Sequence, residues 1–158
     1  MTPALTDGWL AAPFPGIVKR VDAWLDGSAL AIGHSFGAWL LLCAAVERVK
    51  RRVTIPRLLL LAPLLGKGFN EETGVGYYAP RAKPVRTALG IERGRANEDL
   101  LSCLRFVHAK EDGQSTLADA EALRSLGYFV TEVPGGHRLD HRVARTKISA
   151  ILGRLAVK

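Results

Sequence analysis

The sequence predicts a three-layer α/β fold, in which helices cover both faces of a short, mainly parallel sheet of about five strands. Short apolar runs alternate along the chain with longer amphipathic runs, which is typical of strands and helices in such a sheet. The run Ser28–Ile32 consists of apolar residues after the serine, so both of its faces are apolar, as in a central parallel strand. A length of 158 residues with 48% hydrophobic residues suits one domain, residues 1–158, and argues against disordered, collagen-like and coiled-coil classes.

Five apolar runs predict the strands, and each ends at a turn or loop signal. The first stops at Pro13 and Pro15, and the third is closed by Pro63, because proline cannot donate to a strand ladder. The predicted strands are Trp9–Ala12, Ser28–Ile32, Arg57–Ala62, Leu104–His108 and Tyr128–Val133.

The predicted helices are runs in which apolar residues recur at helical spacing. They cover Ile17–Leu25, Phe36–Val49, Leu117–Leu126 and Asp140–Leu155, with a short helix at Val85–Leu89. This short helix lies within residues 66–97, a glycine-rich stretch without clear periodicity. We expect that stretch to form a lid or a substrate-facing insertion.

Composition and charge exclude several classes of partner. The net charge is +7, but the basic residues are dispersed and not interleaved with aromatic residues, so we expect no nucleic-acid partner. The most apolar runs are shorter than the ~20 residues of a membrane-spanning helix, so we expect no membrane partner. Because the first residues lack the pattern of a secretory signal, we expect a cytoplasmic protein. Cys43 and Cys103 have no CxxC or Cys/His cluster around them and are expected to be reduced, buried thiols.

Residues 33–37, GHSFG, match the pattern G-x-S-x-G directly after a predicted strand and directly before a predicted helix. Such a turn holds the serine at unfavourable backbone angles, and we expect Gly33 and Gly37 to give the room that strand and helix require. Ser35 would project above the carboxyl edge of the sheet, where the amide of Phe36 can donate to an oxyanion. This context predicts that Ser35 is a nucleophile.

A nucleophilic serine needs a base to take its proton and a carboxylate to orient that base. In hydrolases of this architecture the order along the chain is Ser, then Asp or Glu, then His, with acid and base on loops after later strands. Asp112 follows the fourth predicted strand, and His137 follows the fifth. Residues 134–136, Pro-Gly-Gly, form a turn with little side chain that lets the imidazole reach back over the strand ends.

Other residues compete for these roles. Glu111 is the rival carboxylate; a position directly before a glycine favours Asp112, but the sequence alone does not decide which one points inward. His34 and His108 precede the acid loop, and His141 lies in the closing helix. With the candidate base, His141 forms H-R-L-D-H, which lacks the acidic residue of H-E-x-x-H and a third ligand. We therefore expect neither a metal nor a cofactor.

Five segments of the chain resemble the α/β-hydrolase superfamily. The resemblance rests on WLAAPFPG at 9–16, GHSFGAWL at 33–40, LLLLAPLLG at 58–66, FVHAKED at 106–112 and VPGGHRL at 133–139. These segments resemble the strand and loop before the elbow, the nucleophile elbow, the next strand, the acid loop and the histidine loop. The resemblance implies that Ser35 is the nucleophile, Asp112 the orienting acid and His137 the general base.

The chain departs from the family ahead of the nucleophile strand. Family members usually carry several strands there, including the one whose following loop gives the second oxyanion amide, whereas eight residues precede Trp9 in this sequence. Backbone amides near Ala12, Phe14 or Gly16 are candidate substitutes. Loss of one oxyanion donor lowers the rate by on the order of 10²–10³.

We expect a serine hydrolase, of esterase or thioesterase type, that cleaves a small-molecule ester or thioester through an acyl-enzyme on Ser35. The alternative is a catalytically weak or inactive binding or scaffold protein, and a third interpretation is one component of a larger assembly. We expect Trp9–Ala12 to pair with Ser28–Ile32. The shortened sheet should leave an apolar edge, which leads us to expect a homodimer.

Overall fold

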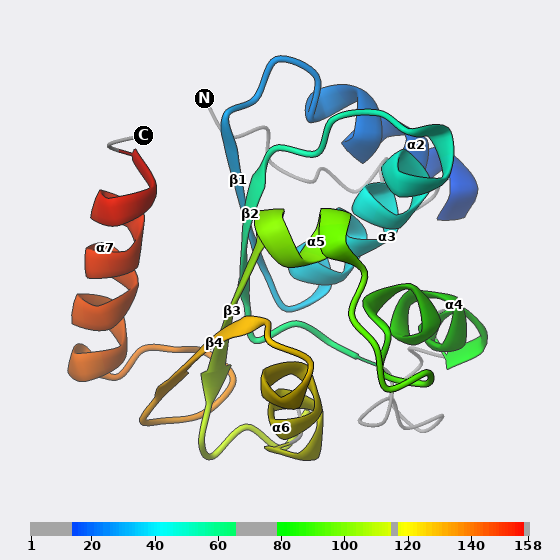
Figure 1. The fold of residues 1–158 in the computed structure, drawn as a ribbon. Coiled ribbons are helices and arrows are strands. Elements are labelled where there is room, and N and C mark those ends of the chain that lie inside the picture. Colours follow the sequence, from blue (N-terminus) through cyan, green and yellow to red (C-terminus); the bar gives the residue numbers. More distant parts are fainter. Residues whose placement is uncertain (1–13, 66–78, 115–116, 157–158) are drawn as a thin grey trace.

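The computed structural model describes residues 14–65, 79–114 and 117–156, with helices and strands that alternate along the chain (Figure 1). The labels follow Figure 1. In chain order the elements are α2 (Phe14–Trp24), β1 (Leu30–His34), α3 (Phe36–Arg51), β2 (Arg57–Leu61), α4 (Ala79–Leu89), α5 (Glu98–Cys103), β3 (Leu104–Ala109), α6 (Leu117–Ser125), β4 (Phe129–Val133) and α7 (Arg142–Ala156).

The four described strands form one parallel sheet in the order β1-β2-β3-β4. Its register places Gly33 opposite Leu60 and Phe106 opposite Val130. Because every strand runs in the same direction, all carboxyl ends meet at one edge, where the segments that follow β1, β3 and β4 begin.

Alternate side chains of the sheet enter two separate cores. Leu58 and Leu60 belong to the cluster that includes α2 and α3, whereas Leu59 and Val107 belong to the cluster formed with α7. Figure 1 shows α7 on one side of the sheet and the other described helices on the opposite side. The predicted three-layer α/β class is therefore confirmed.

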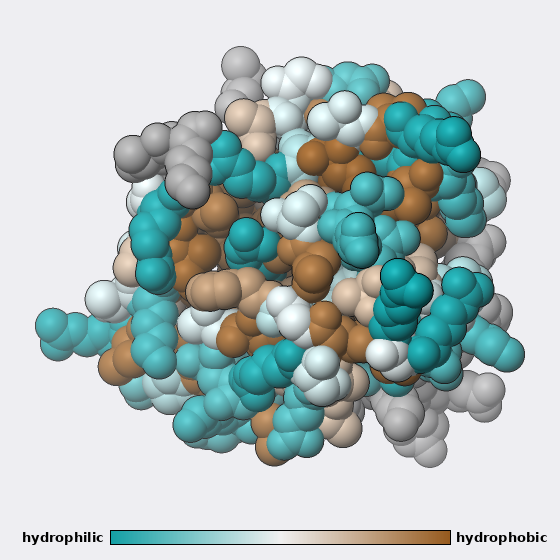
Figure 2. Space-filling model, in the orientation of Figure 1, coloured by the Kyte–Doolittle hydropathy of each residue, from teal (hydrophilic) through white to brown (hydrophobic). Residues whose placement is uncertain are grey.

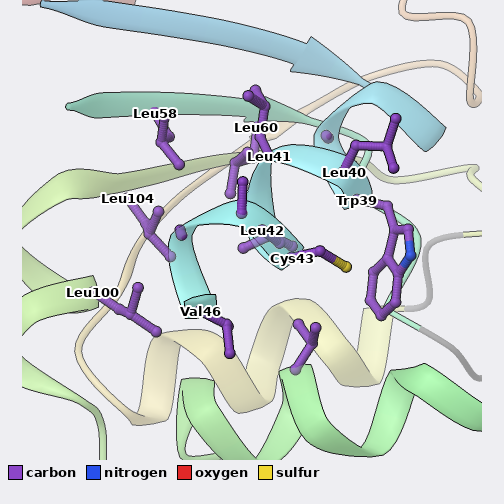
Figure 3. Packing of buried hydrophobic residues seen from close by; sticks show 14 of the residues in the cluster. Trp39, Leu40, Leu41, Leu42, Cys43, Val46, Leu58, Leu60, Leu100 and Leu104 are labelled. Atoms are coloured by element: carbon purple, nitrogen blue, oxygen red, sulfur yellow. The ribbon is translucent and has the colours of Figure 1, made fainter. Parts of the chain in front are cut away.

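Helix α3 is the centre of the larger core. Residues 38–46 are all buried, so this helix is apolar around its whole circumference, as expected of a helix enclosed by other elements. Figure 3 shows its side chains against Leu58 and Leu60 of the sheet and against Leu100 of α5. The packing fixes the position of the first turn of α3, which follows directly after β1.

Several predicted boundaries were wrong for identifiable reasons. Helix α2 begins at Phe14 and not at Ile17, because Pro15 lies in the first turn, where a missing N–H removes no helical hydrogen bond. Helix α4 extends over Ala79–Leu89 although it contains Pro84. The short helix α5 was not predicted. Its start is marked by Asn97, whose side chain accepts hydrogen bonds from the amides of the second and third residues that follow.

The edge of the sheet also differs from the prediction. Ser28–Ile32 was expected to be buried on both faces, but β1 lies at one end of the described sheet and 47% of Ile32 is exposed. On β1, Leu30 packs against the smaller core. The helix of that core, α7, contacts β4, which lies at the opposite end of the sheet from β1. The expected strand Trp9–Ala12 lies outside the described residues, and the expected homodimer stays a prediction.

Among the described helices, none combines the length and apolar character needed to cross a membrane. On the surface, apolar and polar side chains are mixed over the face drawn in Figure 2.

Buried Arg48 joins three segments on the α3 side of the sheet. Its guanidinium donates to Asp22 Oδ1 at 2.7 Å, to the Asp22 carbonyl at 2.6 Å and to the Thr54 carbonyl at 2.8 Å, and it also pairs with Asp26. Only 4% of the Arg48 side chain is exposed, so these partners replace water around a buried charge.

We expect Arg48→Ala to lower the free energy of unfolding by about 3 kcal/mol, because it leaves the half-buried Asp22 carboxylate and two backbone carbonyls without this partner. The control is Lys50→Ala on the same helix, which removes an exposed ion pair with Glu47 and should change stability by less than about 1 kcal/mol. Urea denaturation measures both values. Equal losses in the two variants would contradict the assignment.

The two cysteines are free and buried, as the sequence predicted. The Cys103 thiol donates to the Asp99 carbonyl at 3.2 Å, and burial raises the pKa of Cys103 to about 11. Because both thiols are buried, we expect neither cysteine to react with a disulfide reagent at pH 8 in the folded protein, and both to react in urea. Rapid modification of one thiol before unfolding would contradict this expectation.

Candidate active site

Ser35 occupies a sharp turn between β1 and α3. Its backbone has φ 54° and ψ −118°, a conformation that costs a non-glycine residue on the order of 1–3 kcal/mol. Two hydrogen bonds hold the turn: the Ser35 amide donates to the Leu61 carbonyl at 2.9 Å, and the Trp39 amide donates to the Ser35 carbonyl at 3.1 Å. The strain is thus compensated by the sheet on one side and by the helix on the other.

The two glycines of the turn have different roles. A Cβ on Gly33 would lie 2.6 Å from the backbone nitrogen of Ala38, so only glycine lets β1 approach α3 this closely. A Cβ on Gly37 would meet nothing within 4 Å. The expectation of crowding is therefore correct at Gly33 and wrong at Gly37, which lies within the first turn of α3.

The structure brings together the three side chains that the sequence selected. His137 Nε2 lies 2.7 Å from Ser35 Oγ, and His137 Nδ1 lies 2.8 Å from Asp112 Oδ2. Ser35 follows β1, Asp112 follows β3 and His137 follows β4, so all three lie at the edge where the strands end. Sequence separations of 102 and 25 residues are bridged by this arrangement.

Asp112 is the most enclosed member of the group. Its side chain is 0% exposed, and Oδ1 accepts a hydrogen bond from the Gln114 amide at 2.8 Å. That bond orients the carboxylate and leaves Oδ2 toward the imidazole. The rival carboxylate Glu111 is exposed, so of these two side chains it is Asp112 that points inward toward His137.

The loop that carries His137 is fastened to the acid loop by backbone hydrogen bonds. The Lys110 amide donates to the Val133 carbonyl at 3.0 Å, and the Glu111 amide donates to the Gly135 carbonyl at 3.1 Å. Gly135 has φ 94°, which favours glycine and fits the predicted Pro-Gly-Gly turn. These bonds set the positions of Asp112 and His137 relative to each other.

The other histidines lie in different environments. His108 is buried on β3, and burial lowers its pKa. His141 accepts a hydrogen bond from the Val143 amide at 3.2 Å, at the start of α7. The ring of His34 contacts the backbone of His137, a link that nothing in the sequence indicated. Within 14–65, 79–114 and 117–156, no three His, Cys, Asp or Glu side chains form a group able to hold a metal ion.

The predicted oxyanion donors lie at the start of two helices. Phe36 is the first residue of α3 and directly follows Ser35, so its amide is at the positive end of the helix dipole. Phe14 and Gly16 lie in the first turn of α2. Ala12 lies outside the described residues.

Comparisons with known proteins agree with this architecture at the level of structure. No family model and no curated protein sequence matches the chain. The mouse alpha/beta hydrolase domain-containing protein 10 is similar with a TM-score of 0.59 and 16% identity, over 93% of this chain and 70% of that one.

Two further solved structures are similar to this chain to about the same degree. The monoacylglycerol lipase of Paleococcus ferrophilus matches with a TM-score of 0.57 and 13% identity, over 91% of this chain and 75% of the lipase. The RedJ thioesterase from the prodiginine pathway of Streptomyces coelicolor matches with a TM-score of 0.56 and 18% identity, over 90% of this chain and 68% of the thioesterase. The parallel sheet, the strained serine turn and these likenesses together establish that the chain has the α/β-hydrolase fold.

Proposed function

We propose that the protein is a serine hydrolase that cleaves a carboxylic ester or thioester through an acyl-enzyme on Ser35. The observation that carries the proposal is the hydrogen-bonded chain from Ser35 through His137 to buried Asp112. This is the geometry that a serine needs to lose its proton as it attacks. The lipase and the thioesterase among the structural neighbours support acyl transfer as the reaction class.

In the proposed reaction, Ser35 Oγ attacks the carbonyl carbon of the substrate while His137 Nε2 takes the hydroxyl proton. The carbonyl oxygen becomes an oxyanion, to which the Phe36 amide donates. When the tetrahedral intermediate collapses, the bond to the alcohol or thiol breaks and His137 returns the proton to that leaving group. Water then attacks the acyl-enzyme with the same proton transfers and releases the acid and free Ser35. The steps require no cofactor.

Asp112 has an orienting role in this scheme. Its carboxylate accepts a hydrogen bond from the Nδ1–H of His137, so that the lone pair of Nε2 points toward Ser35. The carboxylate also stabilises the imidazolium that forms during attack. Its burial limits competition from water for the same hydrogen bond.

We further propose that the chain is a single domain in which residues 66–97 form a lid or a substrate-facing insertion. The support is topological, since β2 ends at the same carboxyl edge of the sheet as β1, which leads to Ser35, and residues 66–97 come after β2 in the sequence. Helix α4 lies within it and contributes Val85 and Leu89 to the larger core.

We expect a fluorophosphonate probe to label the folded protein at one residue, Ser35, because only an activated serine displaces its fluoride. Ser35→Ala and His137→Ala should not be labelled, whereas Ser102→Ala, which removes an exposed hydroxyl on α5, should be labelled like the wild type. Mass spectrometry of the adduct measures this. A folded but unlabelled wild type would favour the alternative of a binding or scaffold protein.

Asp112→Asn should lower kcat for a nitrophenyl ester by roughly 10³–10⁴, because an amide in place of the carboxylate favours the wrong tautomer of His137. The neighbouring variant Glu111→Gln removes an exposed carboxylate and should leave kcat within about twofold of the wild type. Steady-state kinetics on both variants makes the comparison. A large loss in Glu111→Gln together with an active Asp112→Asn would reverse the assignment of the acid.

A further inference from the structure

We infer that His34 is a positioning residue that holds the general base in register with the nucleophile, an inference that rests on the proposed hydrolase function. His34 is the last residue of β1 and directly precedes Ser35. Its Nε2 lies 2.7 Å from the backbone carbonyl oxygen of His137, across 103 residues of sequence. One side chain of the nucleophile turn is thereby bonded to the backbone of the residue that would accept the serine proton.

The chemistry of this contact fixes the tautomer of His34. A backbone carbonyl can only accept a hydrogen bond, so Nε2 must carry the proton and donate it. In the neutral ring the lone pair is then on Nδ1. The bond also persists when the ring is protonated, because both nitrogens carry a proton in that state.

The hydrogen bond from His34 to the His137 carbonyl attaches the histidine loop to the strand that leads to Ser35. On its acid side, that loop is held by the amides of Lys110 and Glu111, which donate to the carbonyls of Val133 and Gly135. His34 provides an attachment from β1 at position 137 itself, and its ring lies 5.2 Å from the His137 ring between centroids. The 2.7 Å distance from His137 Nε2 to Ser35 Oγ is therefore set from both flanks.

A contribution to folding alone does not account for this contact. His34 is exposed, and the bond joins two groups that water can reach. Water can replace the imidazole at the His137 carbonyl, so removal of the ring should cost little stability. Proton transfer is far more sensitive, since a displacement of about 1 Å in a reacting group lowers a rate by as much as ~10².

The kinetic test compares His34→Leu, which removes the donor, with His34→Gln, whose side-chain amide restores an N–H at similar reach. We expect kcat for an activated ester to fall roughly tenfold in His34→Leu, with KM little changed, and to recover to within about threefold in His34→Gln. His141→Asn is the matched control, because it changes an exposed histidine four residues after the base and keeps an acceptor for the Val143 amide. It should behave as the wild type, and all three variants should unfold at the wild-type temperature.

Two kinetic outcomes would overturn the inference. One is wild-type kcat in His34→Leu, and the other is an equal loss in the leucine and glutamine variants, which would point to ring size and not to the donor. A fall in unfolding temperature that parallels the loss of kcat would likewise assign His34 to folding.

A spectroscopic test separates this inference from the proposed function. Nitrogen NMR of histidine-labelled Ser35→Ala protein, which needs no turnover, should find His34 with its proton on Nε2. A neutral Nδ1–H tautomer would exclude the bond and overturn the inference even if the enzyme is active. An Nε2–H tautomer in a wild type that is not labelled by the fluorophosphonate would instead refute the hydrolase, and with it the role of His34 in catalysis, while the bond itself stands.

Discussion

The close approach of β1 to the first turn of α3 is the constraint on which the candidate site depends. At Gly33 the strand lies so near to Ala38 that a Cβ would be 2.6 Å from a backbone nitrogen. The chain reverses within this space, and Ser35 takes positive φ to do so. Such a conformation persists only where surrounding structure holds it, and here the sheet and the helix each contribute a backbone hydrogen bond. The strain presents the serine hydroxyl beyond the strand ends.

This turn is held in place by the larger core. Helix α3 is buried over residues 38–46, and its packing against β2 leaves it no freedom to tilt away from β1. Beyond that buried stretch, Arg48 bonds to α2 and to the segment before β2. The carboxyl-terminal half of α3 is therefore held by hydrogen bonds of a charged side chain, and the amino-terminal half is held by apolar packing. The precision of the site therefore comes from elements that take no part in its chemistry.

The parallel sheet explains how distant residues converge. Because β1, β3 and β4 end at the same edge, Ser35, Asp112 and His137 need only short loops to meet. Backbone bonds join the acid and histidine loops, and His34 joins the histidine loop to the nucleophile turn. The nucleophile turn, the histidine loop and the acid loop are thus connected by hydrogen bonds, and each limits the movement of the loop to which it is bonded.

Patterns in the sequence predicted the alternation of strands and helices and the sharp turn at Ser35. These features are local, since apolar periodicity and the pattern G-x-S-x-G depend on neighbours within one or two turns of chain. Only the tertiary structure decided that Asp112 is enclosed while Glu111 is exposed, and that His34 contacts the His137 carbonyl. The predicted length of α4 and the predicted burial of Ile32 were wrong, because both depend on the tertiary structure. The direction of a side chain and the coverage of a strand depend on register and on neighbours far along the chain, which local patterns do not encode.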